Sequence, residues 1–138
     1  MTYEDLTDML VRHEGLKLFP YQDTVGKWTI GVGRNISDNG ITHDEAMVLL
    51  QNDIERATHD LLQQFPIVDT LDSTRFIVLV NMCFNMGSPR LKGFQKMWAA
   101  IECEDYEDAA MEMLDSKWAR QVGSRARELA ELMRKGDD

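Results

Sequence analysis

An abrupt change of residue periodicity near the N-terminus constrains the fold more than any other feature of the sequence. Apolar residues recur at helical spacing up to His13, and Gly15 is suited to end that helix. The following stretch, LKLFPYQDTVGKWTIGVG, contains Pro20, which cannot lie in a helix interior, and then alternates apolar and polar residues as a strand does. A chain of otherwise helical pattern therefore carries an early β-hairpin.

The rest of the sequence predicts an α+β protein in which helices predominate. Thr42 and Glu45 form a capping box that opens a long helix. Asp72 or Ser73 caps another helix, which runs to Gly87 and is apolar on nearly every side, so we expect it to be the buried central helix. The segment SPRLKGF reads as a break. A turn and a third short strand are expected in NISDNG, and further helices at 94–103, 105–119 and 124–134.

Composition limits the classes of function. The 138 residues predict one domain, and 24 acidic against 15 basic residues give a net charge of −9. That charge repels phosphate, so we expect neither nucleic-acid binding nor adhesion to anionic membrane. The longest apolar run, Phe76 to Met86, is too short to span a bilayer, and the acidic N-terminus does not resemble a secretory signal. We therefore expect no membrane insertion and no export signal.

The cysteines and histidines do not indicate a metal centre. Cys83 and Cys103 lack the Cys-x-x-Cys or Cys/His spacing of a zinc site. We expect both to be buried free thiols of a protein made in a reducing cytosol, while a disulfide between them stays open. His43 and His59 lie sixteen residues apart without further ligands nearby. The prediction is therefore a protein with no metal and no cofactor.

Two acids and a hydroxyl frame the predicted hairpin. Glu14 ends the first helix, Asp23 lies at the turn, and Thr29 lies in the second strand. Taken singly, Glu14 reads as a solvated helix-end acid and Asp23 as an ordinary turn residue. Together, two carboxyl groups and a hydroxyl are the groups that glycoside hydrolysis needs. The negative end of the helix dipole disfavours an ionised carboxylate at Glu14, which suits a general acid.

The glycines of this hairpin are a separate signal. Gly31 and Gly33 alternate with apolar residues in a segment that otherwise reads as a strand. Glycine weakens a strand, so its presence there indicates a close approach by backbone or ligand.

The stretch HEGLKLFPYQDTVGKWTIGVG, residues 13–33, resembles the active-site segment of the phage-type lysozymes, glycoside hydrolase family 24. That family's signature is Glu, eight residues, Asp or Cys, five residues, Thr, which Glu14, Asp23 and Thr29 match position for position. The resemblance continues through GITHDEAMVLL, LDSTRFIVLVNMCFNMG and YEDAAMEMLDSKWARQ, and so covers nearly the whole chain. It implies a lysozyme-like fold and a single catalytic domain, residues 1–138. A small β-sheet lobe (about 14–42) would join a larger helical lobe (about 43–138 plus the first helix), with the active-site cleft between them.

The resemblance also implies roles for single residues. Glu14 is the general acid, and Asp23 and Thr29 bracket the attacking water while the anomeric centre is inverted. Phe84 matches a substrate-binding position. Arg125 matches an arginine that approaches the catalytic glutamate.

Three features depart from the family pattern. Arg34 stands in place of a histidine, so any ion pair made by that histidine must be rebuilt. Asn85 stands where a glutamine is familiar, and the segment NISDNGIT is shorter than its counterpart, which trims the small lobe.

We still expect Asn35, at the start of that segment, to bind substrate. Trp118 matches a core tryptophan.

The function that the resemblance implies is a muramidase of bacteriophage. It would hydrolyse the β-1,4 bond between N-acetylmuramic acid and N-acetylglucosamine in peptidoglycan glycan strands, as a monomer, for host cell lysis. It would wait in the host cytoplasm until a separate holin-type protein permeabilised the membrane. Two alternatives stay open, a lytic transglycosylase and a non-catalytic wall-binding module on the same fold. The presence of both Asp23 and Thr29 favours hydrolysis.

Overall fold

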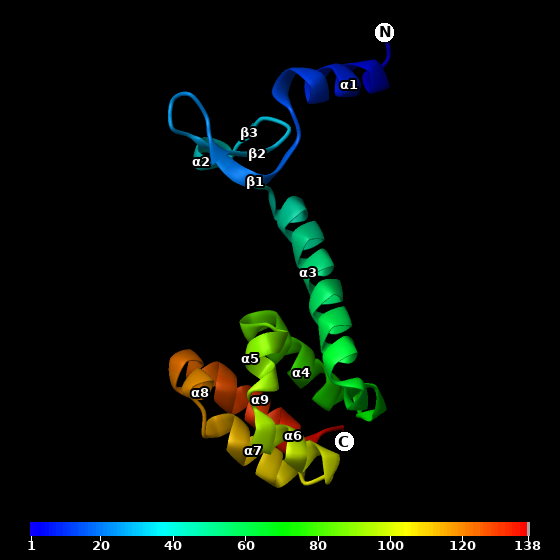
Figure 1. The fold of residues 1–138 in the computed structure, drawn as a ribbon, viewed down its shortest axis with the longest axis vertical. Coiled ribbons are helices and arrows are strands. Elements are labelled where there is room, and N and C mark those ends of the chain that lie inside the picture. Colours follow the sequence, from blue (N-terminus) through cyan, green and yellow to red (C-terminus); the bar gives the residue numbers. More distant parts are fainter. Residues whose placement is uncertain (138) are drawn as a thin grey trace. The chain divides into compact units, whose positions relative to one another are not determined.

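The computed structural model describes residues 1–137 and divides into two compact units, Met1–Val48 and Leu49–Asp138 (Figure 1). The first unit contains α1 (Tyr3–Glu14), β1 (Lys17–Gln22), β2 (Trp28–Gly31), β3 (Arg34–Asn35), α2 (Ile36–Asn39) and the start of α3 (His43–Gln64). The second contains the rest of α3, then η1 (Pro66–Thr70), α4 (Ser73–Met86), α5 (Ser88–Lys92), α6 (Gln95–Glu102), α7 (Tyr106–Leu114), α8 (Lys117–Val122) and α9 (Ser124–Lys135). The predicted α+β class is confirmed.

Helix α1 begins and ends where the sequence predicts. The Thr2 hydroxyl accepts the backbone N–H of Asp5, and the Asp5 carboxylate accepts the backbone N–H of Thr2 at 2.7 Å, which completes a capping box. Gly15 ends the helix with a φ of +79°, a conformation that glycine adopts at little cost. Glu14 is therefore the last residue of the helix.

The three strands form one antiparallel sheet in the order β1-β2-β3. Tyr21 pairs with Thr29, and Thr29 pairs in turn with Asn35 on the other side. The register of β1 and β2 shifts between Lys17 and Tyr21, a stretch that includes Pro20, which has no N–H to donate. The third strand is present as predicted, and the NISDNG segment then forms the short helix α2 rather than a simple turn.

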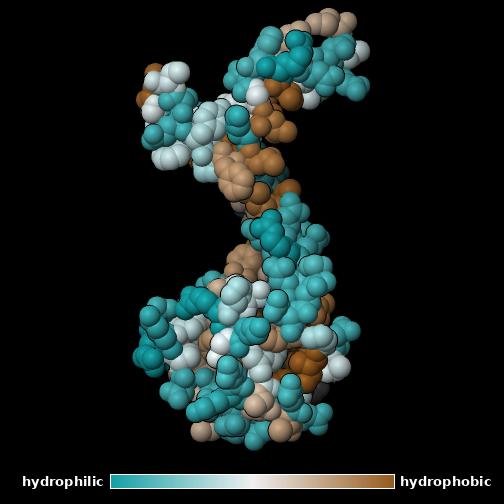
Figure 2. Space-filling view, viewed as in Figure 1, coloured by the Kyte–Doolittle hydropathy of each residue, from teal (hydrophilic) through white to brown (hydrophobic). Residues whose placement is uncertain are grey.

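The first unit is held without an apolar core of its own. Within residues 1–48 the buried residue is Thr29, while Leu18 and Phe19 of β1 are 77% and 83% exposed. Figure 2 shows apolar (brown) side chains gathered at the surface of the strand region. Hydrogen bonds and caps therefore define this unit.

No helix within residues 1–137 is both long enough and apolar enough to cross a membrane.

The second unit contains the hydrophobic core. Val78, Leu79 and Met82 of α4 are completely buried, as the sequence predicts. The helix is not buried on every side, however, because Ile77 and Phe84 are 61% and 44% exposed. Trp118 is 2% exposed and meets Phe94 edge to face at 6.1 Å, as a core tryptophan should. The other buried apolar residues come from α4 itself and from every other helix of the unit: Ala57, Leu61, Val68, Cys83, Met86, Leu91, Met97, Trp98, Ala100, Ile101, Ala109, Ala110, Met113, Ala119, Ala126, Leu129, Ala130 and Met133.

Two predicted elements and one cysteine differ from expectation. The segment SPRLKGF is not a break, because Pro89 lies in the first turn of α5, where its missing N–H is not needed. The helix predicted at 105–119 is two helices. The Ser116 hydroxyl donates to the Met113 carbonyl and accepts the Ala119 N–H, so it ends α7 and caps α8. Cys83 is buried as predicted, but Cys103 is exposed at the end of α6, and both are free thiols.

A polar clasp joins the start of α4 to the end of α9. The Arg75 guanidinium donates to the carbonyls of Met133 at 2.6 Å and Arg134 at 2.9 Å, and pairs with Asp72 at 3.1 Å. The Asp137 carboxylate in turn accepts the backbone N–H of Thr74 at 2.9 Å. The carbonyls at the C-terminus of α9 and an N–H group at the N-terminus of α4, which the helices themselves leave unpaired, thus obtain hydrogen-bond partners.

We predict that Arg75→Met destabilises the protein by about 2–4 kcal/mol, because it leaves carbonyls at the end of α9 and the half-buried Asp72 without a charged donor. The Arg75 side chain is 13% exposed. Arg56→Met is the matched control, since Arg56 pairs with Asp53 at 3.7 Å and is 74% exposed. It should cost less than about 1 kcal/mol. Urea denaturation measures both, and equal losses would contradict the role of the clasp.

Candidate active site

Asp23 closes the turn between β1 and β2 with its side chain. Its Oδ1 accepts the backbone N–H groups of Val25 and Lys27, each at 2.9 Å, and its own N–H donates to the Lys27 carbonyl at 2.9 Å. Asp is favoured in turns for this kind of bonding. Since both of these backbone hydrogen bonds reach Oδ1, Oδ2 is the oxygen of Asp23 that is available to a water or a substrate.

Thr29 lies in β2, and both Thr29 and Asp23 form side-chain hydrogen bonds with the backbone of Lys27. The Thr29 hydroxyl donates to the Lys27 carbonyl at 3.1 Å, and the residue is 5% exposed. Because its proton points at that carbonyl, the hydroxyl oxygen keeps its lone pairs for accepting a hydrogen bond. The backbone of Lys27 thus fixes the carboxylate of Asp23 and the hydroxyl of Thr29 together.

Glu14 reaches the same unit from the end of α1. Its side chain is exposed and lies against Gly33, in the turn between β2 and β3. A β-carbon at Gly33 would stand 2.5 Å from Oε2 of Glu14, too close for any real contact. The glycine pattern predicts a close approach by backbone or ligand, whereas at Gly33 the neighbour is a side chain, and a β-carbon at Gly31 would meet no heavy atom within 4 Å. The partner is the candidate acid itself.

The neighbouring positions Arg34 and Asn35 are engaged in structural hydrogen bonds. The Arg34 guanidinium grips the Glu45 carboxylate, with one N–H donating to Oε1 at 2.7 Å and a second nitrogen 2.6 Å from Oε2. Asn35 caps α2, where its Oδ1 accepts the Asp38 N–H at 3.0 Å. Arg34 therefore forms an ion pair within the first unit, at the capping box of α3.

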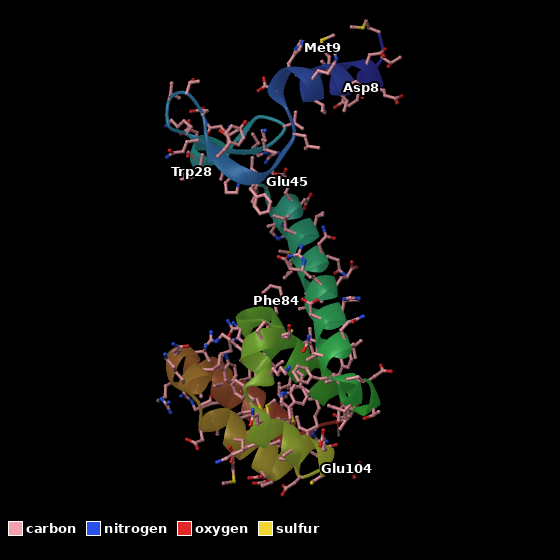
Figure 3. All side chains as sticks on the ribbon, in the orientation of Figure 1. Asp8, Met9, Trp28, Glu45, Phe84 and Glu104 are labelled. Carbon is pink, nitrogen blue, oxygen red and sulfur yellow. The ribbon has the colours of Figure 1, made fainter. Side chains whose placement is uncertain are left out.

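In the second unit, Phe84 and Arg125 line a groove of about 480 Å³ whose walls are mostly apolar (Phe84 is labelled in Figure 3). The Asn81 amide oxygen accepts two N–H groups of the Arg125 guanidinium, at 2.8 and 3.1 Å. Asn85, the residue that departs from the family pattern, accepts the indole N–H of Trp118 at 2.7 Å.

The structure thus collects the candidate residues into two groups. Glu14, Asp23, Thr29 and Asn35 belong to the first unit, and Phe84 and Arg125 share a groove in the second. In the first group, Asp23 and Thr29 share the backbone of Lys27. Within residues 1–137 no cluster of three or more His, Cys, Asp or Glu side chains is arranged to hold a metal ion.

Sequence reasoning missed two participants. Lys27 acts through its backbone, so its side-chain type carries no signal of that role. Asn81 is one of two asparagines in an apolar helix, and an unexpected polar residue in such a helix is the signal that would have singled it out.

Comparison with known proteins gives consistent similarities along the chain. The Phage lysozyme family model matches residues 11–136. Probable T4-type lysozyme 2 of Dictyostelium discoideum is 29% identical over 161 aligned residues, covering 95% of this chain and 94% of that protein. The Endolysin of Acyrthosiphon pisum secondary endosymbiont phage 1 is 29% identical over 116 residues, covering 81% of this chain and 75% of its own. The Pre-baseplate central spike protein Gp5 of Enterobacteria phage T4 is 29% identical over 160 residues, covering 96% of this chain but 28% of that longer protein.

The small antiparallel sheet and the helical second unit form a lysozyme-like α+β fold. The protein is an enzyme of the lysozyme type, a hydrolase of peptidoglycan. With the family model matching nearly its whole length, the chain belongs to the phage lysozyme family.

The ion pair of Arg34 predicts a pH-dependent contribution to stability. The backbone hydrogen bond from Thr42, together with the Arg34 guanidinium, holds the pKa of Glu45 below its ordinary value. A lowered folded pKa stabilises the protein above the unfolded pKa, near pH 4.3, and this contribution is lost as pH falls through the folded pKa. Glu45→Gln should therefore lower the melting temperature at pH 7, and the difference from the unmodified protein should shrink towards pH 3.

Thermal melts across this range measure the effect, with Glu55→Gln as the control in the same helix. Glu55 accepts a hydrogen bond from Gln51 rather than from an arginine. A difference for Glu45→Gln that stays constant or grows on acidification would contradict the prediction.

Proposed function

We propose that the protein is a muramidase that hydrolyses the β-1,4 bond between N-acetylmuramic acid and N-acetylglucosamine, with inversion at the anomeric carbon. The observation that carries the proposal is the shared backbone of Lys27, which fixes Asp23 and Thr29 in one arrangement. Inversion needs a water held opposite the leaving oxygen. A carboxylate oxygen and a hydroxyl oxygen anchored to one residue can hold such a water between them.

Glu14 is the general acid in this mechanism. It gives its proton to the glycosidic oxygen as the bond to the anomeric carbon breaks, and positive charge develops on the sugar ring. The Asp23 carboxylate stabilises that charge and accepts a proton from the attacking water. The Thr29 hydroxyl accepts the water's other hydrogen bond, since its own proton is committed to the Lys27 carbonyl.

Asn35, Phe84 and Arg125 bind substrate in this proposal. Phe84 is 44% exposed and offers an apolar ring face to a sugar. The Arg125 guanidinium is oriented by Asn81 and has further N–H groups for acidic or hydroxyl partners. Asn35 pairs with Thr29 in the sheet, and this adjacency supports a contact between Asn35 and the sugar that the water-holding pair faces. The amide would have to exchange its hydrogen bonds with Asp38 for that contact.

The biological setting that we propose is lysis of a bacterial host by a bacteriophage. Residues 1–138 act as one catalytic domain and as a monomer on peptidoglycan glycan strands. The protein is held in the host cytoplasm and reaches the wall when a separate holin-type protein permeabilises the membrane. The similarity to a phage protein named Endolysin supports this setting.

The two alternatives differ from this proposal in testable ways. A lytic transglycosylase closes a 1,6-anhydro ring and needs no water, so the pairing of Asp23 with Thr29 would have no purpose there. A non-catalytic wall-binding module needs no acid at position 14. The retention of Glu14, Asp23 and Thr29 in one unit favours hydrolysis over both.

We predict that Glu14→Gln folds normally and loses about 10²–10⁴-fold in the rate of peptidoglycan cleavage, because the amide cannot supply a proton to the leaving oxygen. Release of reducing ends from purified peptidoglycan measures the rate, and thermal melts verify folding. Glu4→Gln is the matched control, since Glu4 is an exposed acid in the first turn of the same helix. A folded Glu14→Gln variant that cleaves at a rate comparable to Glu4→Gln would refute the assignment.

We also predict that the first product released is the α-anomer. A water held between Asp23 and Thr29 requires carboxyl groups about 6.5–9.5 Å apart and attacks from the face opposite the leaving group. Proton NMR of a peptidoglycan-derived oligosaccharide during the first turnovers distinguishes the anomers before mutarotation. A β-anomer would mean a double displacement through Asp23, and a 1,6-anhydro product would establish the transglycosylase instead.

A further inference from the structure

The turn between β2 and β3 contains a glycine whose missing side chain is filled by the candidate acid. Gly33 has a φ of +66°. A β-carbon at this position would stand 2.5 Å from Oε2, 2.9 Å from Cδ and 3.1 Å from Cγ of Glu14. The whole end of the Glu14 side chain therefore lies over the backbone of Gly33, in the space that any other residue would occupy.

A second glycine of the same hairpin lacks this neighbour. Gly31 ends β2 with a φ of +70°, but a β-carbon there would meet no heavy atom within 4 Å. Backbone conformation accounts for a glycine at either position. At Gly33 an additional requirement applies, which is the approach of a carboxyl group.

Among the residues of the first unit, Gly33 is the neighbour that the structure shows against the end of the Glu14 side chain. Glu14 is an exposed residue at the last position of α1, directly before the chain turns at Gly15. A long side chain at such a place samples several rotamers unless a rigid neighbour limits them. A general acid must instead keep its carboxyl group close to the oxygen that it protonates.

We infer that Gly33 is a positioning residue for Glu14, which lets the carboxyl group rest against the β2–β3 turn and so holds it at the leaving oxygen. This inference rests on the proposed role of Glu14 as the acid. It gives the glycine at position 33 a purpose in the reaction that Gly31 does not share.

The inference separates activity from stability. In Gly33→Ala the new methyl group takes the place of the carboxyl group, and the exposed, flexible Glu14 side chain swings away at small cost to folding. A displacement of about 1 Å is enough to lower a rate by about 10²-fold. The stability loss comes instead from the positive φ, which both glycines share.

The experiment compares Gly33→Ala with Gly31→Ala as the matched control. We expect similar decreases in melting temperature for the two variants. We expect kcat on peptidoglycan fragments to fall by about 10²-fold in Gly33→Ala, with KM nearly unchanged, and by less than about 5-fold in Gly31→Ala. Equal kcat losses in the two variants, or a loss in Gly33→Ala that a larger fall in melting temperature explains, would overturn the inference.

An NMR measurement tests the contact without relying on catalysis. The protein should show a nuclear Overhauser effect between the γ-protons of Glu14 and the α-protons of Gly33. Gly31→Ala should keep the effect between Glu14 and Gly33. Gly33→Ala should show no effect between the γ-protons of Glu14 and the α-proton at position 33. Absence of the effect from the unmodified protein would overturn the inference. If the effect is present but the unmodified protein does not cleave peptidoglycan, the proposed function fails while the contact stands.

Discussion

The hydrogen bonds that the Asp23 carboxylate accepts are the constraint on which the first unit depends. They fold Val25 and Lys27 back into a tight turn, and that turn sets the register in which Tyr21 meets Thr29. The same register places Asn35 beside Thr29. A residue proposed to hold the reacting water is thus also the residue that builds the turn, so chemistry and local folding cannot vary independently at this position. The two carboxylate oxygens of Asp23 have different roles, because Oδ1 accepts the hydrogen bonds of the turn and Oδ2 is left for the water.

The two units are stabilised by different physical means. The second is a helical body around fully buried residues such as Leu79 and Met82, and apolar burial supplies most of its folding free energy. The first has no such core within residues 1–48 and relies on directional polar contacts, among them the capping boxes at Thr2 and Thr42 and the ion pair of Arg34 with Glu45. Directional contacts hold polar groups in fixed geometry, which suits the unit that carries the candidate acids.

Much of this arrangement could be predicted from the sequence because it depends on local patterns. The cap at Thr2, the stop at Gly15, the capping box at Thr42 and the burial of α4 follow from residue type and spacing. The candidate acids stood out through the resemblance to the phage-type lysozyme signature, which Glu14, Asp23 and Thr29 match. The break at Ser116 was not predicted, since a serine in an apolar periodic pattern gives no warning that it will bond both backwards and forwards. The roles of Gly33 towards Glu14 and of Asn81 towards Arg125 require contacts between segments distant in sequence, which periodicity does not encode.

The clasp between α4 and α9 has a consequence for synthesis of the chain. Its partners are separated by about sixty positions, with Asp72 accepting the backbone N–H of Asp137 and Arg75 donating to the Met133 carbonyl. During synthesis the start of α4 leaves the ribosome well before Met133 and Asp137 do. Until those residues have emerged, the backbone N–H of Thr74 lacks the Asp137 carboxylate, and Arg75 lacks the Met133 carbonyl. The clasp therefore forms only after α9 has been made, so the closure of the second unit follows the synthesis of all its helices.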